Sequence, residues 1–404
     1  MRNLKLLVTD LVISSLLLLF ASSCNKTATP ALPSVLILNV SSITISTASI
    51  TFDVLSNGNQ NITAAGTCYS STNNQPTLAT DKYTNDATST GIYNSSLTGL
   101  NENTTYYIRA YATNASGTTY GNTIVFQTAA GWAKQISGTT NILNSIYFTD
   151  ANNGYAVGNN GTILKTTNAG VNWTSQNSGT IVNLNSIYFT NVTNGYIVGD
   201  NGTILYTNNS GNTWATQTSG TSTNLNSIHF TNSNNGYAVG NNGIILSFNG
   251  TNWASQTIGT NNLNSVCFTG TTGYAVGDNG TILTTSNGVN WTRQTIGINN
   301  LNSIYFVGTT GYVVGVGGTI LVTSNGGIIW TAQTSSTGNE LQGICFSDAN
   351  NGYAVGVGAT ILATNNGGSN WYKEPSGTSN ILFGVYIISQ HAYAVGGGGT
   401  ILHF

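Results

Sequence analysis

Seven tryptophans at an almost constant spacing are the feature that most limits how this chain can fold. Successive tryptophans are 41, 41, 39, 38, 39 and 41 residues apart, and all lie after residue 130: Trp132, Trp173, Trp214, Trp253, Trp291, Trp330 and Trp371. A repeat of about forty residues is typical of β-propeller blades or of helical solenoids. Glycine and β-branched residues dominate each copy and no helical periodicity competes, so the repeats predict an all-β propeller.

Each repeat is expected to contain four short strands. In the copy at 143–173 the first strand reads LNSIYF, the second GYAVG and the third TILKT, and the fourth begins at the tryptophan. The repeat region opens with a fourth strand, 132–135, and closes with a third strand, 400–404. Pairing of these two segments would complete a ring without open sheet edges. We therefore predict a seven-bladed β-propeller over 131–404, with residues 132–135 closing the last blade.

The turn between the second and third strands is rich in glycine, as a phosphate-binding loop is. In the first copy it reads GNNG at 158–161. A phosphate loop occurs once and opens a helix, whereas this segment recurs in every copy and opens a strand. Asn-Gly is also the strongest signal for a two-stranded hairpin. We therefore interpret these glycines as turn formers.

The turn between the third and fourth strands carries a second signature. The segment Thr166-x-Asn168-x-Gly170-x-Asn172-Trp173 resembles the Asp-box of the BNR repeat family, with Asn where that family usually has Asp. The whole repeat, LNSIYFTDANNGYAVGNNGTILKTTNAGVNW, resembles the propeller of photosystem II assembly and stability factors. The resemblance implies the propeller fold and a general scaffold role. It does not extend to that family's arginine-rich surface, because Arg293 is the one arginine in 131–404.

A second β-domain is expected before the propeller, over residues 34–128. This region contains alternating, strand-like runs, and its segment 100–121 resembles a fibronectin type III domain. Leu100, Thr104 and Tyr106 match that family's spacing around the tyrosine corner, where the phenol bonds to the backbone. The resemblance implies a β-sandwich that serves as a spacer or an interaction module.

The chain begins with an expected export signal. Residues 1–23 combine Arg2 and Lys5 with a short apolar stretch, and small residues precede Cys24. This arrangement resembles a bacterial lipoprotein signal, which predicts a lipid anchor on Cys24 and a tether over 24–33. The outer membrane or cell surface is the predicted location, with cleavage after Ser23 and plain secretion as the alternative.

The chain has few charged side chains, which limits the kinds of partner it can bind. Only 5% of the residues are charged, and nine Lys plus Arg in 404 residues cannot neutralise many phosphates, so nucleic-acid binding is excluded. A sialidase is excluded as well, because such an enzyme clamps its carboxylate substrate with several arginines. The propeller has six carboxylates: Asp150, Asp200, Asp278, Glu340, Asp348 and Glu374. The four aspartates occupy turns, where Asp and Asn are interchangeable.

One carboxylate pair is worth testing for glycoside hydrolysis, which needs two carboxylates about 5–10 Å apart. Asp278 and Glu340 are expected at the same end of the ring. Three further side chains share one slot, the fifth position of LNSIYF: His229, Cys267 and Cys345. Because they belong to three different blades, we interpret them as packing residues. His391 and His403 have no apparent partner. We therefore predict no catalytic residues, no metal site and no cofactor.

The loops from each fourth strand to the next first strand are rich in hydroxyls and amides and nearly free of charge, for example SGTTNI at 137–142. They should gather at one end of the ring and present a surface for a protein or a glycan. The function predicted from the sequence is non-catalytic binding or scaffolding by an exported, lipid-anchored protein. A polysaccharide-active hydrolase and a structural surface protein without a specific ligand are the alternatives.

Overall fold

The computed structural model describes residues 29–404, so the predicted signal and Cys24 lie outside the described residues. The chain divides into two compact units, Met1–Ala129 and Ala130–Phe404. Among the described residues no helix is long and apolar enough to span a membrane. Each unit is built from antiparallel strands, which confirms the predicted all-β class.

The N-terminal unit consists of two sheets that share one core. The first sheet has the order β1-β2-β5, and the second has the order β4-β3-β6-β7 with β8 also paired to β6. Their bounds are β1 (Ser34–Ser41), β2 (Ala48–Ser56), β3 (Ala64–Ser70), β4 (Lys82–Tyr83), β5 (Gly91–Leu97), β6 (Thr105–Asn114), β7 (Gly117–Tyr120) and β8 (Ile124–Gln127). Alternate residues of both sheets, among them Ile50 and Ile108, pack in this core.

Tyr106 makes the contact that a tyrosine corner requires. The main-chain N–H of Asn101 donates to its phenol oxygen at 2.9 Å. Ala31, at the end of the predicted tether, is held against this unit, because its N–H donates to Gly58 O and its own carbonyl accepts from Asn114 Nδ2. The assignment of the unit to the fibronectin type III family stays a prediction.

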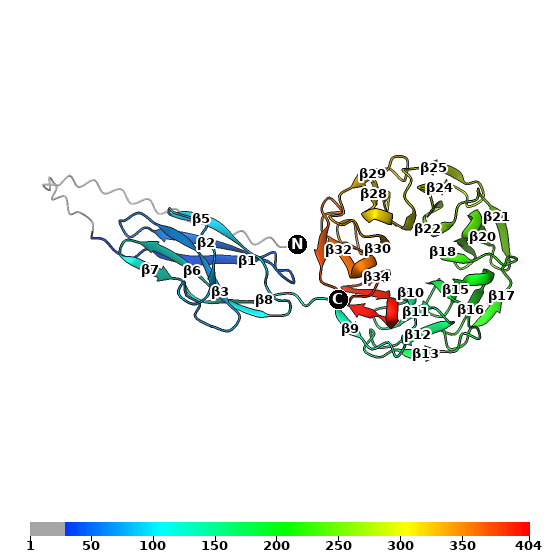
Figure 1. The fold of residues 1–404 in the computed structure, drawn as a ribbon, viewed down its shortest axis with the longest axis horizontal. Helices are drawn as coiled ribbons and strands as arrows, with labels where there is room; N and C mark the ends of the chain where they lie inside the picture. The colour runs from blue at the N-terminus through cyan, green and yellow to red at the C-terminus, as the bar shows by residue number, and fades with distance from the viewer. Residues whose placement is uncertain (1–28) are drawn as a thin grey trace, which may run out of the picture. The chain divides into compact units, whose positions relative to one another are not determined.

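The C-terminal unit contains seven four-stranded antiparallel sheets, the blades, arranged as a ring in Figure 1. Blade one comprises β10 (Leu143–Phe148), β11 (Gly154–Gly158), β12 (Thr162–Thr166) and β13 (Thr174–Gln176). Blade two comprises β14 (Leu184–Phe189), β15 (Gly195–Gly199), β16 (Ile204–Thr207) and β17 (Ala215–Gln217). Blade three comprises β18 (Leu225–Asn232), β19 (Asn235–Gly240), β20 (Ile244–Phe248) and β21 (Trp253–Thr257).

Blades four to six repeat the same order. Blade four comprises β22 (Leu263–Thr269), β23 (Thr272–Gly277), β24 (Thr281–Thr285) and β25 (Thr292–Thr295). Blade five comprises β26 (Leu301–Val307), β27 (Thr310–Gly315), β28 (Ile320–Thr323) and β29 (Thr331–Gln333). Blade six comprises β30 (Leu341–Phe346), β31 (Gly352–Gly356), β32 (Thr360–Thr364) and β33 (Tyr372–Glu374). Short 3₁₀ turns lie between the second and third strands of several blades: η1 (Asp200–Gly202), η2 (Asn241–Gly243), η3 (Val316–Gly318), η4 (Val357–Ala359) and η5 (Gly397–Gly399).

Blade seven joins the two ends of the unit. It comprises β34 (Leu382–Ile388), β35 (His391–Gly396), β36 (Ile401–His403) and, as its outer strand, β9 (Ala133–Gln135). The register pairs Ile401 with Gln135 and His403 with Ala133, which is the pairing that the strand count predicted. Trp132, only 4% exposed, precedes β9 and packs edge-on against Tyr353 of blade six.

An aromatic joint connects most neighbouring blades. In blades one to six, the phenylalanine at the sixth position of the first strand stacks on the second-strand tyrosine of the preceding blade, as Phe189 does on Tyr155 with ring centroids 4.3 Å apart. The tryptophan of the same blade, here Trp214, covers that phenylalanine edge-on. Offset and edge-to-face contacts of this kind are worth about 0.5–1.5 kcal/mol beyond their burial. Blade seven differs, because Ile387 stands where the other blades have phenylalanine.

The glycines of the second strand are required by close packing rather than by a ligand. A Cβ on Gly158 would lie 1.9 Å from the carbonyl oxygen of Ile142, and one on Gly154 would lie 2.5 Å from the ring of Phe148. The Asp-box turn folds as its sequence predicted. Thr166 Oγ1 accepts from Gly170 N–H and Asn168 Oδ1 accepts from Asn172 N–H, both at 2.9 Å, with Gly170 at φ +82°.

Candidate functional site

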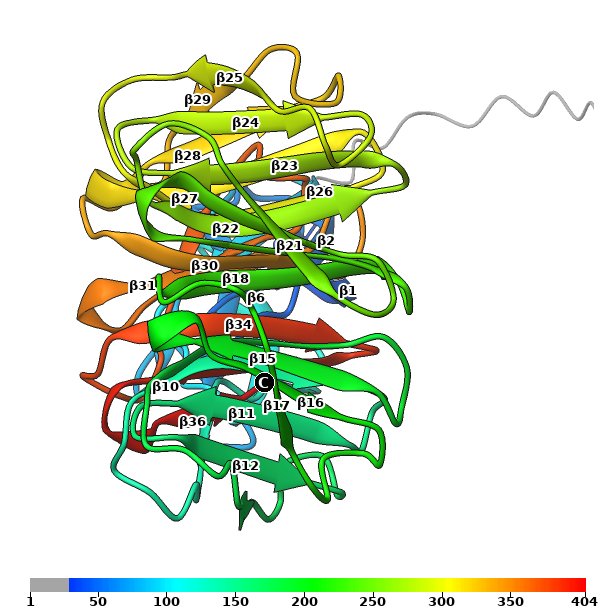
Figure 2. The same cartoon turned by 90° about the vertical axis from the view of Figure 1, so that its right-hand side faces the viewer.

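The antiparallel order of the strands gives the propeller two different faces (Figure 2). One carries the connections from fourth to first strands and the turns between second and third strands, and we call it the loop face. The other carries the turns between first and second strands and the Asp-box turns, and we call it the Asp-box face. Candidate site residues from the sequence occur on both faces.

Asparagines link neighbouring blades along the inner part of the loop face. In five blades the second residue of the first strand donates from Nδ2 to the carbonyl of the first-strand leucine in the next blade, at 2.9 Å each time. These pairs are Asn144–Leu184, Asn185–Leu225, Asn226–Leu263, Asn264–Leu301 and Asn302–Leu341. Repeated contacts between blades make this part of the loop face a rigid frame.

Two of the predicted turn aspartates brace this frame. Asp200 accepts from Asn183 and Asn185 at 2.9 and 3.0 Å. Asp278 accepts in the same way from Asn262 and Asn264 at 2.9 and 3.2 Å. Asp therefore does more here than form a turn, because its two oxygens tie the turn to the preceding loop and to the first strand.

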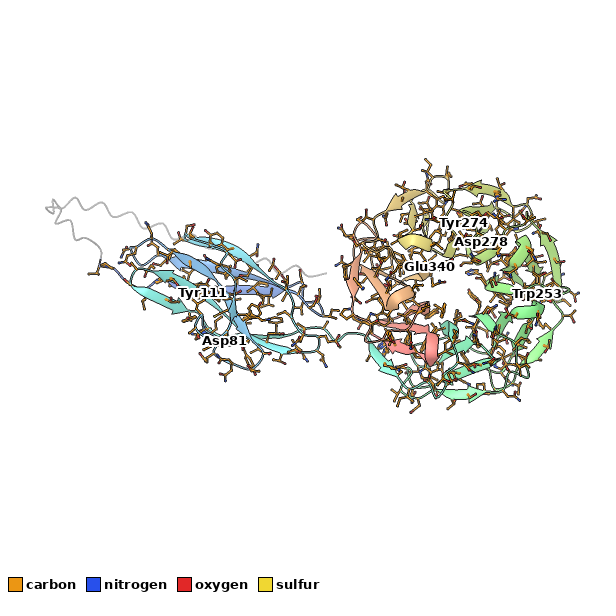
Figure 3. All side chains as sticks on the ribbon, viewed as in Figure 1. Asp81, Tyr111, Trp253, Tyr274, Asp278 and Glu340 are labelled. Atoms are coloured by element: carbon orange, nitrogen blue, oxygen red, sulfur yellow. The ribbon has the colours of Figure 1, made fainter. Side chains whose placement is uncertain are left out.

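The pair singled out for hydrolysis, Asp278 and Glu340, is labelled in Figure 3. Asp278 follows β23 in blade four, whereas Glu340 precedes β30 in blade six, so blade five separates them in the ring. Glu340 accepts from Asn302 Nδ2 at 2.9 Å. Both carboxylates are therefore held by side-chain amides in contacts that join elements of the frame.

The aspartates of the Asp-box face are turn formers, as the sequence indicated. Asp348 Oδ1 accepts from the N–H groups of Asn350 and Asn351 at 2.8 and 3.0 Å. The Asn351 side chain and these N–H groups lower the pKa of Asp348 to about 2. Asp150 accepts from Asn152 and Asn153 in the equivalent turn. A carboxylate so stabilised in its ionised form is a poor general acid.

Glu374 has a role that the sequence analysis missed. It is 6% exposed and occupies the third position of an outer strand, where the other blades have glutamine. Its Oε2 accepts from Trp132 Nε1 at 2.9 Å. Gln135 accepts in the same way from Trp173 at 3.0 Å. The closing segment is thus anchored to blade six by Glu374 and to blade one by Gln135. Aligning the seven copies would have shown the exchange of Gln for Glu.

The fifth-position side chains of the first strands bridge adjacent blades. Tyr147 and Tyr386 donate to the carbonyls of Phe189 and Phe148 at 3.0 Å. In the same slot, burial lowers the pKa of His229 to about 4, and it raises the pKa of Cys267 to about 12 and of Cys345 to about 11. Both cysteines therefore remain thiols, which are poor nucleophiles and poor metal ligands. Within 29–404, no group of three or more His, Cys, Asp or Glu is placed to hold a metal ion.

His391 and His403 are not isolated, contrary to the sequence analysis. His403 Nε2 lies 2.9 Å from His391 Nδ1, and the His403 ring stacks on Tyr393 with centroids 4.5 Å apart. Burial, together with the nearby His391, lowers the pKa of His403 below its usual value. The two histidines meet because β35 pairs with β36 with Tyr393 opposite His403. Spacing along the chain does not reveal this register.

The loop face also carries exposed apolar side chains and a depression, which Ile136 lines. Ile136, Ile181 and Ile298 are 84–87% exposed. A depression of about 840 Å³ is lined by residues 134–141 together with Gly398 and Gly399, and Lys134 is its one charged residue. The Asp-box face has smaller depressions, of about 390 and 310 Å³, lined by uncharged residues of blades three to five. The larger depression therefore lies on the loop face.

Comparisons with known proteins agree on the propeller. The family model for the photosynthesis system II assembly factor YCF48 matches residues 125–216 and 174–249. No curated protein matches the chain. A solved structure titled "YCF48 bound to D1 peptide" is 18% identical, with a TM-score of 0.58, and the match covers 68% of this chain and 94% of that one. YCF48 from Cyanidioschyzon merolae is 20% identical, with a TM-score of 0.58 and coverages of 68% and 98%.

A propeller from another group has a comparable shape. The WD40 propeller domain of Doa1 is 11% identical, with a TM-score of 0.56, and the match covers 68% of this chain and 97% of that domain. At such identities the structural likeness establishes the fold alone. The sequence match to the assembly-factor model supports the predicted resemblance to photosystem II assembly factor-like BNR propellers.

Proposed function

We propose that this chain, whose propeller resembles the photosystem II assembly factor-like BNR propellers, is an exported, lipid-anchored protein that binds a protein partner on its loop face and catalyses no reaction. The loop face carries the proposal. Its inner part is braced by contacts between blades, and its outer part presents the exposed isoleucines and the depression beside Lys134. A rigid surface that displays apolar side chains with little charge is typical of the centre of a protein interface.

A protein is favoured over a glycan as the partner for two reasons. The most exposed apolar side chains of the loop face are aliphatic isoleucines, and burying them stabilises a complex only against an apolar counterpart. In addition, one similar propeller has been solved with a bound peptide. The carboxylates of the loop face do not suggest hydrolysis, because Asp278 and Glu340 are engaged by the amides of Asn262, Asn264 and Asn302.

The repeats supply matched variants for testing the binding face. Ile136, Ile181 and Ile298 align with Asn177, Thr140 and Thr260 in other copies, so Ile136→Asn, Ile181→Thr and Ile298→Thr introduce residues that the fold already accepts. The wild type and the triple variant are each used to capture proteins from cell envelopes. We expect the triple variant to lose saturable binding of the partner protein that the wild type retains. The control is Val171→Thr with Val289→Thr and Ile328→Thr, which alters exposed residues of the Asp-box turns.

Each other outcome points to a different function. Loss of binding in the control alone would move the interface to the Asp-box face. Saturable binding on a glycan array would indicate a glycan ligand, and no saturable binding to any panel would indicate a structural surface protein. Release of reducing sugars that is abolished in both Asp278→Ala and Glu340→Ala would refute the non-catalytic assignment.

The lipid anchor is tested separately. The proposal rests on the short apolar segment of the signal and on the small residues before Cys24. Radiolabelled palmitate should be incorporated by the wild type but not by Cys24→Ala. The control variant Cys345→Ala should be labelled as the wild type is, because the thiol that it removes is buried in the propeller. Equal labelling of the Cys24→Ala variant would refute the anchor, and unlabelled wild type recovered from the medium would indicate plain secretion.

A further inference from the structure

Blade seven contains a pair of imidazoles in direct contact. His391 begins β35 and His403 ends β36, so both lie at the end of their strands that belongs to the Asp-box face. Tyr393 faces His403 across the ladder, and His391 lies two residues before Tyr393 on the same face of the sheet. The side chains therefore converge, and His403 Nε2 lies 2.9 Å from His391 Nδ1.

The surroundings hold the two rings in place. His403 stacks on Tyr393 with an interplanar angle of 6°, and the Tyr393 hydroxyl is fixed by the carbonyl of Ala169 in the Asp-box turn of blade one at 3.1 Å. Both imidazoles are partly buried at the junction of blades seven and one. Their nitrogens are thus ordered by packing while part of each ring remains open to solvent.

The pair is specific to this blade. The other blades have Asn153, Asn194, Asn235, Thr272, Thr310 and Asn351 where blade seven has His391. They have Lys165, Tyr206, Ser247, Thr284, Val322 and Ala363 where it has His403. The fold thus forms six blades without histidine at either position, so neither imidazole is needed to form a blade.

Imidazole nitrogens are preferred ligands of zinc, copper and nickel ions. In the square-planar or tetragonal geometry of Cu²⁺ and Ni²⁺, two nitrogens bound at about 2.05 Å from the metal and at right angles to each other are about 2.9 Å apart, which matches the observed separation. We propose that His391 and His403 form a bidentate binding site for a divalent transition-metal ion of tetragonal preference, Cu²⁺ or Ni²⁺. The remaining coordination positions are open to water or to a side chain of a partner.

The test measures metal binding by the full exported chain. Cu²⁺ is added in steps and followed by electron paramagnetic resonance, which detects nitrogen ligands through their hyperfine splitting, and Ni²⁺ binding is measured by calorimetry. We expect one strong site per chain with two nitrogen ligands. The variants His391→Asn and His403→Thr place residues of other blades in the site. Each should weaken binding more than about tenfold, because even residues that only support a metal ligand cost 10–100-fold when mutated.

The control is His229→Tyr, which removes the one other histidine of the chain and introduces the residue that most other blades have in that slot. This variant should bind Cu²⁺ and Ni²⁺ as the wild type does. Urea melts of all three variants show whether the propeller remains folded. Equal metal affinity in the wild type, His391→Asn and His403→Thr, or no binding in any of them, would overturn the proposal. The two rings would then be an ordinary hydrogen-bonded pair that shares one proton.

Discussion

The contact between Glu374 and Trp132 should control how firmly the propeller is closed. Both side chains are buried, and the indole N–H of Trp132 donates to the Glu374 carboxyl at 2.9 Å. Glu374→Ala removes the acceptor and leaves a buried donor unpaired, which costs about 1–3 kcal/mol. That range corresponds to about a 5- to 160-fold change in the unfolding equilibrium. The loss in free energy of unfolding is best measured at pH 4, where the wild-type carboxyl of Glu374 is largely protonated.

The pH dependence gives the same contact a second signature. Burial raises the pKa of Glu374 above its usual value of 4.5, although the bond from Trp132 opposes this. Between that value and the raised pKa of the folded state, the folded protein binds more protons than the unfolded protein. Stability therefore falls as the pH rises through this window. Glu374→Gln keeps an acceptor and does not titrate, so it should match the wild type at pH 4 and exceed it at pH 7.

The assay is urea unfolding followed by tryptophan fluorescence, which reports on the propeller because all seven tryptophans lie there. Gln176→Ala serves as the matched control. Gln176 holds the equivalent position in blade one, but Trp214 Nε1, which would be its partner, makes no hydrogen bond. Its replacement should change stability by less than about 0.5 kcal/mol. If Glu374→Ala and Gln176→Ala have equal effects at pH 4, or if Glu374→Gln is less stable than the wild type at pH 7, the reasoning is refuted.

Three further predictions concern packing. Trp132→Ala should destabilise the propeller by about 3–5 kcal/mol in urea melts. The control is Trp253→Ala, because the indole of Trp253 is only partly buried. If Trp132→Ala lowers stability no more than Trp253→Ala does, the ring is not tightly closed at Trp132. Gly158→Ala forces a Cβ to within 1.9 Å of the Ile142 carbonyl oxygen and should cost at least about 1–3 kcal/mol. Gly397→Ala should cost less, because the added carbon would lie 3.8 Å from Asn380 Cβ, an ordinary van der Waals contact. Equal melting temperatures of the two variants would contradict this. Tyr106→Phe removes the acceptor for Asn101 N–H and should lower the stability of the N-terminal unit by about 1 kcal/mol in circular-dichroism melts, while leaving the tryptophan-detected transition unchanged.

The sequence was most informative where the copies agree. The strand at 143–148, the second strand at 154–158 and the third at 162–166 have the predicted bounds, because seven variants of one pattern average out the local ambiguity of any single copy. The Asp-box turn was predictable for a further reason. Its hydrogen bonds join residues only four apart, such as Thr166 and Gly170, so they depend on local sequence alone.

The features that could not be predicted from the sequence depend on contacts between strands or between blades. The meeting of His391 and His403 follows from the register of β35 on β36, which the spacing of residues does not specify. The bracing role of Asp278 requires that Asn262 and Asn264 converge on one turn. Glu374 was treated as one more carboxylate because its partner, Trp132, lies 242 residues earlier. The lipid anchor on Cys24 and the fibronectin type III assignment stay predictions.

The pairing of β9 with β36 has a consequence for how the chain is made. Gln135 and Ile401, which face each other in the last sheet, are 266 residues apart, whereas the four strands of every other blade follow one another directly. Blades one to six can therefore form in sequence as the polypeptide emerges, but β9 finds its partner only after residues 401–403 have been made. A product truncated before Ile401 keeps β9 unpaired, and such an exposed strand is a target for proteases and chaperones. Ring closure thus requires that the polypeptide has been made at least as far as His403.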